Sequence, residues 1–209
     1  MNKYKNLQIA TATPFFNVNL PVQSNPALPN YNPVGGTFPS GVYLNAGDAE
    51  MRGVELELLA RPVPGLSIEV SGSYLDFEYK SLSAQALASG LLPTMVAPLA
   101  PKWKMSAGIQ YDIPFVGGTL TPRIDYAYQS TSYGTSVNAA RNMLEERNLV
   151  NARLAYKTAD GDWEAALAVT NLTKDYFYYS KIDLLAVGGY VTGAPSRPRE
   201  WSFSVTRRF

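Results

Sequence analysis

The segment Asn45–Tyr79, NAGDAEMRGVELELLARPVPGLSIEVSGSYLDFEY, decides the fold. Before the turn Arg61–Gly65 (RPVPG), apolar and acidic residues alternate as VELEL over Val54–Leu58. After the turn, SIEVS over Ser67–Ser71 repeats the same period of two. Because successive side chains of a strand point to opposite faces, this pattern predicts two strands joined as a hairpin, each with one apolar and one polar face.

The same alternation returns along the rest of the chain. It predicts about eight strands, most of them long enough to cross a bilayer at a tilt, which takes roughly 9–11 residues. The expected strands are 2–10, 49–60, 66–80, 102–113, 118–132, 147–158, 162–179 and 199–209. The fold class is therefore all-β, with antiparallel strands.

The connections between these strands alternate strictly between short and long. The short ones are Arg61–Gly65, Pro114–Gly117 and Ala159–Gly161. The long ones span about 11–48, 81–101, 133–146 and 180–198. A transmembrane β-barrel has short periplasmic turns and longer outer loops, whereas a soluble sandwich has no reason to sort its loops in this way. The pattern favours an antiparallel transmembrane barrel with the C-terminus on the periplasmic side.

The alternation also predicts the direction of each face. The apolar rows would face lipid and the Ser, Thr, Lys, Glu and Arg rows would face a polar interior. Many tyrosines and tryptophans fall near expected strand ends, as in an interfacial aromatic girdle. An aromatic core of a soluble β-sandwich is the alternative, and partition into detergent or liposomes would distinguish the two. Arg207 interrupts the outward apolar row close to the chain end, where its side chain could reach the interface.

Composition excludes several classes of function. The 209 residues include no cysteine and no histidine, and the net charge is +1. Disulfides, Cys/His zinc sites, haem with a His or Cys ligand, and Ser-His or Cys-His catalytic pairs are therefore impossible. The near-zero net charge argues against nucleic-acid binding. We expect no enzyme activity, no catalytic residue, no cofactor site and no metal site.

Several stretches resemble the β-barrel of TonB-dependent outer-membrane receptors. The clearest is Asn45–Tyr79, which shows an N-A-x-x-G-V-E type pattern followed by a Pro-Gly-Leu turn. The matching positions are Asn45, Ala46, Gly53, Val54, Glu55, Pro64, Gly65 and Leu66. Ala100–Pro114, Val169–Ser180 and Gly193–Phe209 resemble three further barrel segments of this family, in the same order along the chain.

The resemblance implies a location and a set of partners. It identifies 1–209 as the C-terminal portion of a larger, 22-stranded barrel in the bacterial outer membrane, without the family's signal peptide, TonB box or plug domain. The whole receptor would take up a scarce nutrient, a ferric siderophore being the expected ligand. The expected partners are outer-membrane lipid, the plug domain and TonB complex of a full-length receptor, and the barrel-assembly machinery, which would read the C-terminal Phe209. A self-contained small barrel with a structural or passive pore role is the alternative.

Four local features invite a functional interpretation. Leu82–Ala100 is apolar but carries two prolines, so it is expected to be a loop rather than a membrane helix. Ser136–Asn148 could form a short helix in an outer loop. Asn171-Leu172-Thr173 matches a glycosylation sequon but is interpreted as part of a strand. The carboxylates of Glu55 and Glu57 share one strand face, which is interpreted as a solvated lumen wall rather than a catalytic pair.

Two groups near the expected outer rim could contact a ligand. One is the aromatic run Tyr176–Tyr179 and the other is the pair Arg197 and Arg199. Aromatic and cationic side chains suit aromatic or anionic chelates. A girdle and a solvated rim explain the same residues more simply, so neither group is assigned as a site.

Overall fold

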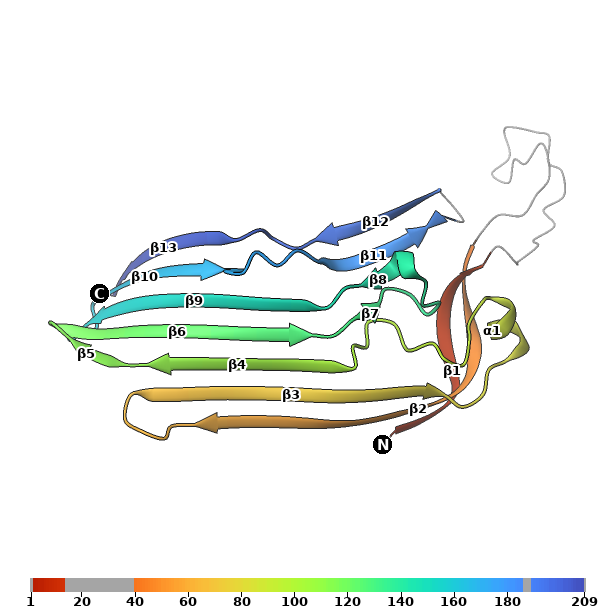
Figure 1. Ribbon diagram of the computed structural model, residues 1–209, viewed down its shortest axis with the longest axis horizontal. Coiled ribbons are helices and arrows are strands. Elements are labelled where there is room, and N and C mark those ends of the chain that lie inside the picture. Colours follow the sequence, from red (N-terminus) through yellow and green to blue (C-terminus); the bar gives the residue numbers. More distant parts are fainter. Residues whose placement is uncertain (1, 14–39, 186–188, 209) are drawn as a thin grey trace.

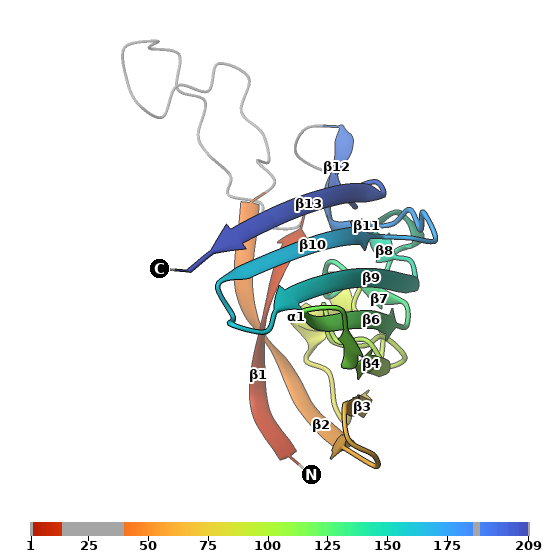
Figure 2. The same cartoon turned by 90° about the vertical axis from the view of Figure 1, so that its left-hand side faces the viewer.

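The computed structural model describes residues 2–13, 40–185 and 189–208. Nearly all of this chain lies in antiparallel strands, and the main sheet is curved rather than flat (Figures 1 and 2). Residues 14–39 of the predicted connection 11–48, and the terminal Phe209, lie outside the described residues. No helix in the described part of the chain is long and apolar enough to cross a membrane.

The main sheet has nine strands, eight of which form a continuous path in the order β1-β2-β3-β4-β6-β9-β10-β13, while β5 pairs with β6 alone. The strands of the path are β1 Asn2–Thr13, β2 Ser40–Ala60, β3 Leu66–Tyr79, β4 Trp103–Tyr111, β6 Gly118–Gln129, β9 Arg147–Thr158, β10 Trp163–Thr170 and β13 Glu200–Arg207; β5 is Ile113–Phe115. Each strand of the path corresponds to one of the eight expected from the sequence, so the fold class is confirmed. The predicted connection 11–48 is wrong in its last part, because β2 begins at Ser40 rather than at 49. In the described residues β1 pairs only with β2 and β13 only with β10, so they form the two edges.

The connections are sorted by length between the two ends of the sheet. The turn Arg61–Gly65 and the turns before β6 and β10 lie at one end (Figure 1). At the other end lie the long segments between β3 and β4, between β6 and β9 and between β10 and β13, together with the start of β2. Below, these are called the turn end and the loop end.

The segments at the loop end contain short elements that the sequence reading missed. Helix α1 (Ala84–Ala88) occupies the predicted loop 81–101, with Ser83 as its N-cap. The predicted helix over Ser136–Asn148 is wrong, because only the 3-10 turn η1 (Ala140–Asn142) forms, between the paired two-residue strands β7 (Ser132–Tyr133) and β8 (Met143–Leu144). The predicted loop 180–198 instead contains the hairpin of β11 (Tyr178–Leu184) and β12 (Tyr190–Pro195).

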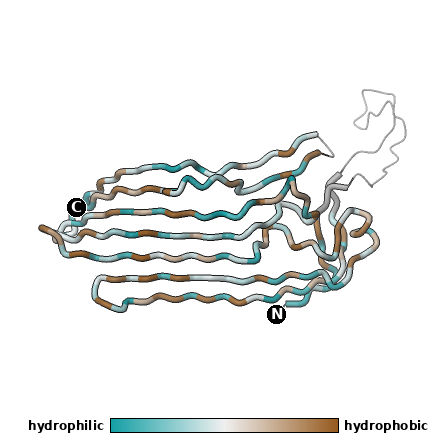
Figure 3. The backbone as a smooth tube through the Cα atoms, in the orientation of Figure 1, coloured by the Kyte–Doolittle hydropathy of each residue, from teal (hydrophilic) through white to brown (hydrophobic). Residues whose placement is uncertain are grey.

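The two faces of the main sheet differ as the alternation predicted. In register, Leu58 of β2 pairs with Val70 of β3, Val70 with Ala107 of β4, and Ala107 with Tyr126 of β6, so these side chains form one row across the sheet. We call this side the apolar face; its exposed members include Val54, Leu56, Leu58, Val70, Met105, Ile109, Ile124, Leu154, Leu167, Phe203 and Val205. The tube in Figure 3 shows the resulting change of hydropathy along the central strands.

A small apolar core lies at the loop end. Ile9, Leu44 and Ala49 of β1 and β2 pack there with Ala86 and Leu91 from the α1 segment. Elsewhere the exposed side chains of the apolar face have no second layer to cover them among the described residues. A soluble protein rarely exposes a continuous apolar surface of this extent.

Candidate functional site

The polar face of the main sheet carries its charged residues in cross-strand rows. Glu69 of β3, Gly108 of β4 and Asp125 of β6 form one row, and Gln110 and Arg123 are partners in the next. These positions alternate with those of the apolar face, because a strand has a side-chain period of two. The polar rows therefore share one side of the sheet.

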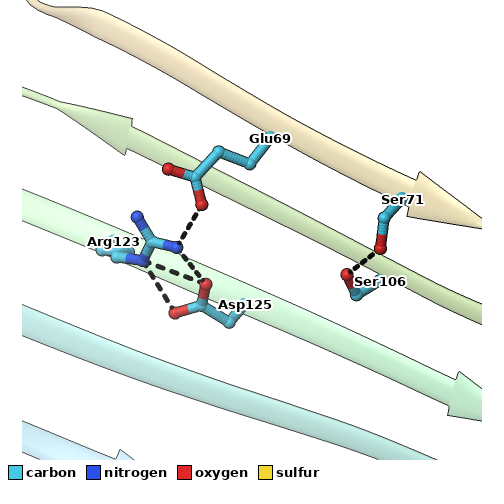
Figure 4. A network of polar contacts seen from close by, with 5 residues as sticks. All are labelled: Glu69, Ser71, Ser106, Arg123 and Asp125. Carbon is cyan, nitrogen blue, oxygen red and sulfur yellow. Dashed lines mark hydrogen bonds and ion pairs between the residues drawn. The ribbon is translucent and has the colours of Figure 1, made fainter. Parts of the chain in front are cut away.

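Arg123 of β6 forms charge-assisted hydrogen bonds with Glu69 of β3 and with Asp125 of its own strand (Figure 4). Its Nη2 donates to Glu69 Oε2 at 2.9 Å and to Asp125 Oδ1 at 2.7 Å, and its Nε donates to Asp125 Oδ1 at 2.9 Å. Nearby, Ser71 and Ser106 join the adjacent strands β3 and β4, with their Oγ atoms 2.8 Å apart. The guanidinium thus connects β6 to β3 across the intervening strand β4.

Gly108 provides the space for this crossing. It is buried, and a Cβ atom added there would lie 2.9 Å from Arg123 Nη2 and 2.9 Å from Asp125 Oδ1. The side chains from the neighbouring strand therefore occupy the volume that a residue with a Cβ would need. A strand glycine often marks such a close approach.

Most charges nearer the turn end are also paired on the polar face. Glu164 accepts from Arg153 Nη2 at 2.6 Å and lies 3.6 Å from Arg208 Nη2. Asp112 accepts from Thr121 Oγ1 at 2.8 Å. The charged groups in this part of the face have partners within the sheet, so we interpret this part as a structural wall.

Three charged residues nearer the loop end differ, because their side chains have no such partners among the described residues. Glu55, Glu57 and Lys104 form no hydrogen bond or ion pair through their side chains with any other described residue. They border a hollow of about 500 Å³ whose wall also contains Ser71 and Ser73. Glu55 and Glu57 do share one face, as predicted, and small neighbours leave room for a partner group beside them.

Aromatic residues on the apolar face lie at two levels. On β4, Trp103 stands near the loop end, beside Tyr74 at 4.6 Å between ring centroids, while Tyr111 stands near the turn end. Eight residue steps at ~3.4 Å, tilted by roughly 40°, separate the two by about 21 Å in depth, close to the ~25 Å apolar band of outer-membrane barrels. At the turn end the guanidinium of Arg207 lies 5.2 Å from the ring centroid of Trp163. This arrangement supports the girdle interpretation.

At the loop end, the β11–β12 hairpin docks on the segment between β6 and β9. Lys181 Nζ donates to Glu145 Oε1 at 2.5 Å and to the Met143 carbonyl at 2.7 Å, and Arg141 pairs with Asp183. The hydrogen bond from Lys181 lowers the pKa of the Glu145 carboxyl. These contacts hold the hairpin against its neighbour.

Asn171 anchors the base of that hairpin. Its Nδ2 donates to the carbonyls of Asp175 at 2.8 Å and Arg197 at 3.1 Å, and its Oδ1 accepts from the Asp175 amide at 2.8 Å. The residue is 4% exposed and has a φ of +50°, a conformation that asparagine tolerates better than most residues. The prediction that it belongs to a strand is wrong: β10 ends at Thr170, and the buried amide fixes the turn that follows.

The two predicted rim groups lie side by side, because the amide of Ser196, next to Arg197, donates to the Phe177 carbonyl at 2.7 Å. In the aromatic run, Phe177 is buried, Tyr176 is exposed, and the Tyr176 and Tyr178 hydroxyls are 3.3 Å apart. Arg147 lies over the rings of Phe177 and Tyr179, at 5.3 and 5.6 Å. The side chain of Arg197 forms a loose ion pair with Glu200 at 3.9 Å. From the sequence alone Arg147 is expected on a solvated loop face, whereas the structure places it against these two rings.

The described part of the chain contains no group of three or more acidic side chains that could hold a metal ion. The prediction of no resident metal site stays a prediction for the whole chain.

A curved antiparallel sheet with an apolar face, a charged opposite face and loops at one end defines the wall of a β-barrel. The chain belongs to the family described as TonB dependent receptor-like, beta-barrel, whose family model matches residues 1–172. This is a family of transport receptors of the bacterial outer membrane. No curated protein gives a significant match.

Solved receptor structures share the fold at low sequence identity. The ferric yersiniabactin uptake receptor FyuA from Yersinia pestis has a TM-score of 0.67 and 20% identity, covering 80% of this chain and 25% of that one. The pyoverdine receptor FpvA from Pseudomonas aeruginosa PAO1, bound to pyoverdine, has a TM-score of 0.63 and 19% identity, covering 99% and 26%. BauA, the ferric preacinetobactin receptor from Acinetobacter baumannii, has a TM-score of 0.60 and 22% identity, covering 80% and 23%. The chain thus spans about a quarter of these receptors.

Proposed function

We propose that residues 1–209 form the C-terminal portion of the barrel of an outer-membrane receptor that takes up a ferric siderophore. The observation that carries the proposal is the combination of an apolar face, a charged face and loops at one end in a chain of this family. The siderophore ligand is supported by the solved receptors that share the fold. The two sheet edges support a segment of a larger barrel over a small closed one, because a strand in hydrocarbon needs partners on both sides.

In this proposal the parts of the sheet have different partners. The apolar face meets lipid, and the paired charges near the turn end stiffen the wall. Glu55, Glu57 and Lys104 face the interior, where a plug domain supplies complementary groups in the full receptor. TonB acts on that plug, and the assembly machinery reads Phe209. The chain by itself catalyses nothing and does not transport.

Membrane orientation can be tested cleanly because the chain has no cysteine. Leu56→Cys and Glu57→Cys are matched neighbours on opposite faces. In outer-membrane vesicles, the Cys at 57 should react with a water-soluble maleimide at least tenfold faster than the Cys at 56. In intact cells, an impermeant maleimide should label Tyr43→Cys at the loop end and leave Asp160→Cys at the turn end unlabelled. Equal labelling at 56 and 57 would contradict the barrel-wall assignment.

Uptake is tested separately, in the reading frame that encodes the whole receptor. Deleting it should abolish accumulation of radioactive iron from at least one ferric siderophore in a panel that includes yersiniabactin, preacinetobactin and pyoverdine. Complementation with the whole frame should restore uptake, and complementation with residues 1–209 alone should not. Unchanged uptake of the whole panel would contradict the siderophore ligand and leave the membrane orientation intact.

A further inference from the structure

Toward the loop end, the apolar face of β2 and β3 becomes charged. Val54 and its register partner Tyr74 form the last apolar row in that direction. Two residues further along both strands, and so on the same side of the sheet, Arg52 is the register partner of Asp76. The surface that would meet lipid therefore changes to ionised side chains within one strand repeat.

The charges beyond this boundary form one patch. In its next row, Lys3 of β1 pairs with Glu50 of β2, and Glu50 pairs with Glu78 of β3. Lys102, which precedes β4, places its Nζ 5.5 Å from the centroid of the Tyr74 ring. We call this surface the outer charged patch; its members are Lys3, Glu50, Arg52, Asp76, Glu78, Lys80 and Lys102.

Two carboxylates of the patch are neutralised by its own cations. Glu50 accepts from Arg52 Nη2 at 2.9 Å and lies 3.3 Å from Lys80 Nζ, and its side chain is 8% exposed. Lys80 also hydrogen bonds to Glu78. The side chains of Arg52 and Lys80 are 59% and 42% exposed, so both cations remain open to a further anionic group.

Two lysines add positive charge that these carboxylates do not balance. Lys3 and Lys102 are exposed and form no ion pair with any other described residue, and Asp76 is the one carboxylate of the patch in the same condition. Lys102 lies beside β3, because its carbonyl accepts from the Leu75 amide at 2.9 Å, whereas Arg52 lies on the other side of β3. Two strand spacings of ~4.8 Å place their backbones about 10 Å apart.

The patch lies at the depth of lipid headgroups when the apolar face spans the hydrocarbon. Two residue steps of ~3.4 Å, tilted by roughly 40°, put Arg52 about 5 Å beyond Val54 in depth. The headgroup layer on each side of a bilayer is roughly 5–7 Å thick. Below the patch, Val54 and Leu56 are 69% and 64% exposed, so acyl chains can lie against them.

We propose that the outer charged patch binds the phosphorylated headgroup of a lipid whose acyl chains lie on the apolar face. Guanidinium and ammonium groups both bind phosphate oxygens through charge-assisted hydrogen bonds. The spacing of Arg52 and Lys102 suits a headgroup with phosphates at two points better than one with a single phosphate. The proposal rests on the proposed function only in that the apolar face must meet a membrane.

The test uses the full chain refolded in neutral detergent micelles, with EDTA present so that no divalent cation bridges lipid and protein. Native mass spectrometry measures the binding of lipid A, an acylated disaccharide with two phosphates. Lipid A should bind at least fivefold more tightly than monophosphoryl lipid A, and inorganic phosphate at the same concentration should not compete. Equal binding of the two lipids, or competition by inorganic phosphate, would overturn the proposal.

Charge variants of the patch should change this binding in opposite directions. Lys102→Gln should weaken lipid A binding at least threefold, and Lys3→Gln added to it should bring the loss to at least tenfold. Asp76→Asn should strengthen binding, because it removes the unpaired carboxylate between the cations. Lys157→Gln, on an exposed lysine of β9 near the turn end, should change nothing. Unchanged binding in the folded double variant, with folding checked by circular dichroism, would contradict the proposal.

Lipid that stays bound after extraction from outer membranes gives a second readout that needs no refolding. The whole receptor with both lysine substitutions should retain at most half as much phosphorylated lipid per protein as the wild type. Retention of as much lipid as in the wild type would refute the proposal. Normal cysteine labelling at 56 and 57 with no effect of these lysines would sink this proposal alone, whereas equal labelling at 56 and 57 would sink the proposed function.

Discussion

The guanidinium of Arg123 reaches Glu69 at 2.9 Å by passing over Gly108, the residue between them in the sheet. The crossing shows how a barrel wall can place a long side chain over a strand it does not belong to. The Arg123 side chain is 29% exposed and that of Glu69 is 52% exposed, so solvent screens the pair. We therefore attribute the contribution of this pair to wall stability more to its geometry, which joins β3 to β6, than to charge attraction.

Replacing Gly108 with valine should displace this crossing. The added side chain would meet atoms of Arg123 and Asp125 at 2.9 Å, and overpacking of this kind costs about 1–3 kcal/mol. Urea unfolding in detergent micelles, monitored by tryptophan fluorescence, measures the loss. Gly72→Val is the matched control, since its only neighbour within 4 Å is the Lys104 carbonyl at 3.9 Å. Equal destabilisation of the two variants would show that loss of a strand glycine alone is responsible.

Removing the charge of Glu69 should have a smaller effect than filling Gly108. Glu69→Gln keeps the shape, and an exposed pair contributes ~1 kcal/mol or less. The same urea experiment at low and high salt should show the small loss shrinking with ionic strength. A loss above about 2 kcal/mol would mean that the pair is desolvated in the assembled barrel.

Asn171→Ala should loosen the base of the β11–β12 hairpin. The substitution leaves the Asp175 amide and two carbonyls without their side-chain partner, and each buried polar group left unpaired costs about 1–3 kcal/mol. Hydrogen exchange should accelerate in 171–197 and stay unchanged in β3 and β4. Thr173→Ala is the control, because its hydroxyl makes only a 3.4 Å contact with the Asn148 carbonyl.

The docking of the hairpin should weaken in acid. The pKa of Glu145 is lowered in the folded protein by its hydrogen bond from Lys181, so this carboxylate stabilises docking above its unfolded pKa, near 4.5. The contribution is lost as the pH falls through the lower folded value. Limited proteolysis with pepsin, compared from pH 5 down to pH 3, should show increasing cleavage within 180–192. Glu145→Gln should make cleavage at pH 5 resemble that at lower pH; an unchanged profile would contradict this role.

Arg147 should be needed for the order of β11 more than for the main sheet. Its guanidinium contacts the rings of Phe177 and Tyr179 and donates to Gln129 Oε1 at 2.6 Å. Arg147→Ala should therefore accelerate exchange of the β11 amides several-fold, while Arg147→Lys should recover only part of the protection, because lysine lacks the planar group that stacks on rings. Matching exchange rates in the wild type and Arg147→Ala would refute this.

The sequence predicted the main sheet well because every strand in it has a different environment on each side. Val54–Leu58 shows the pattern in five residues, and turns such as Arg61–Gly65 mark where each strand stops. The prediction failed after Thr170, where the aromatic residues that follow resemble a continued strand. Asn171 ends the strand instead, through contacts with Asp175 and Arg197, and no local pattern reveals bonds to a residue 26 positions away.

The candidate sites show the same division. The shared face of Glu55 and Glu57 follows directly from their spacing. The fastening of the long segment after β3 to the one after β6 does not, because it depends on Asn138 bonding to Val96, 42 residues away in sequence. The predicted helix at Ser136–Asn148 failed for a related reason: Asn138 bonds to Val96 in a neighbouring segment, and Asn142 bonds to Thr135 and Val137 in its own, so the chain adopts turns instead.

The row that joins Leu58, Val70, Ala107 and Tyr126 has a genetic consequence. A substitution in such a row changes one position on one face, and its neighbours can adjust. Deleting a single residue from the middle of β4 would exchange the faces of the residues beyond it in the strand, carrying Gln110 toward lipid and Tyr111 toward water. Insertions and deletions should therefore be rare within the strands, whereas the segments at the loop end can vary in length. New recognition properties would then arise there by changes in gene length, on a wall that changes only by point mutation.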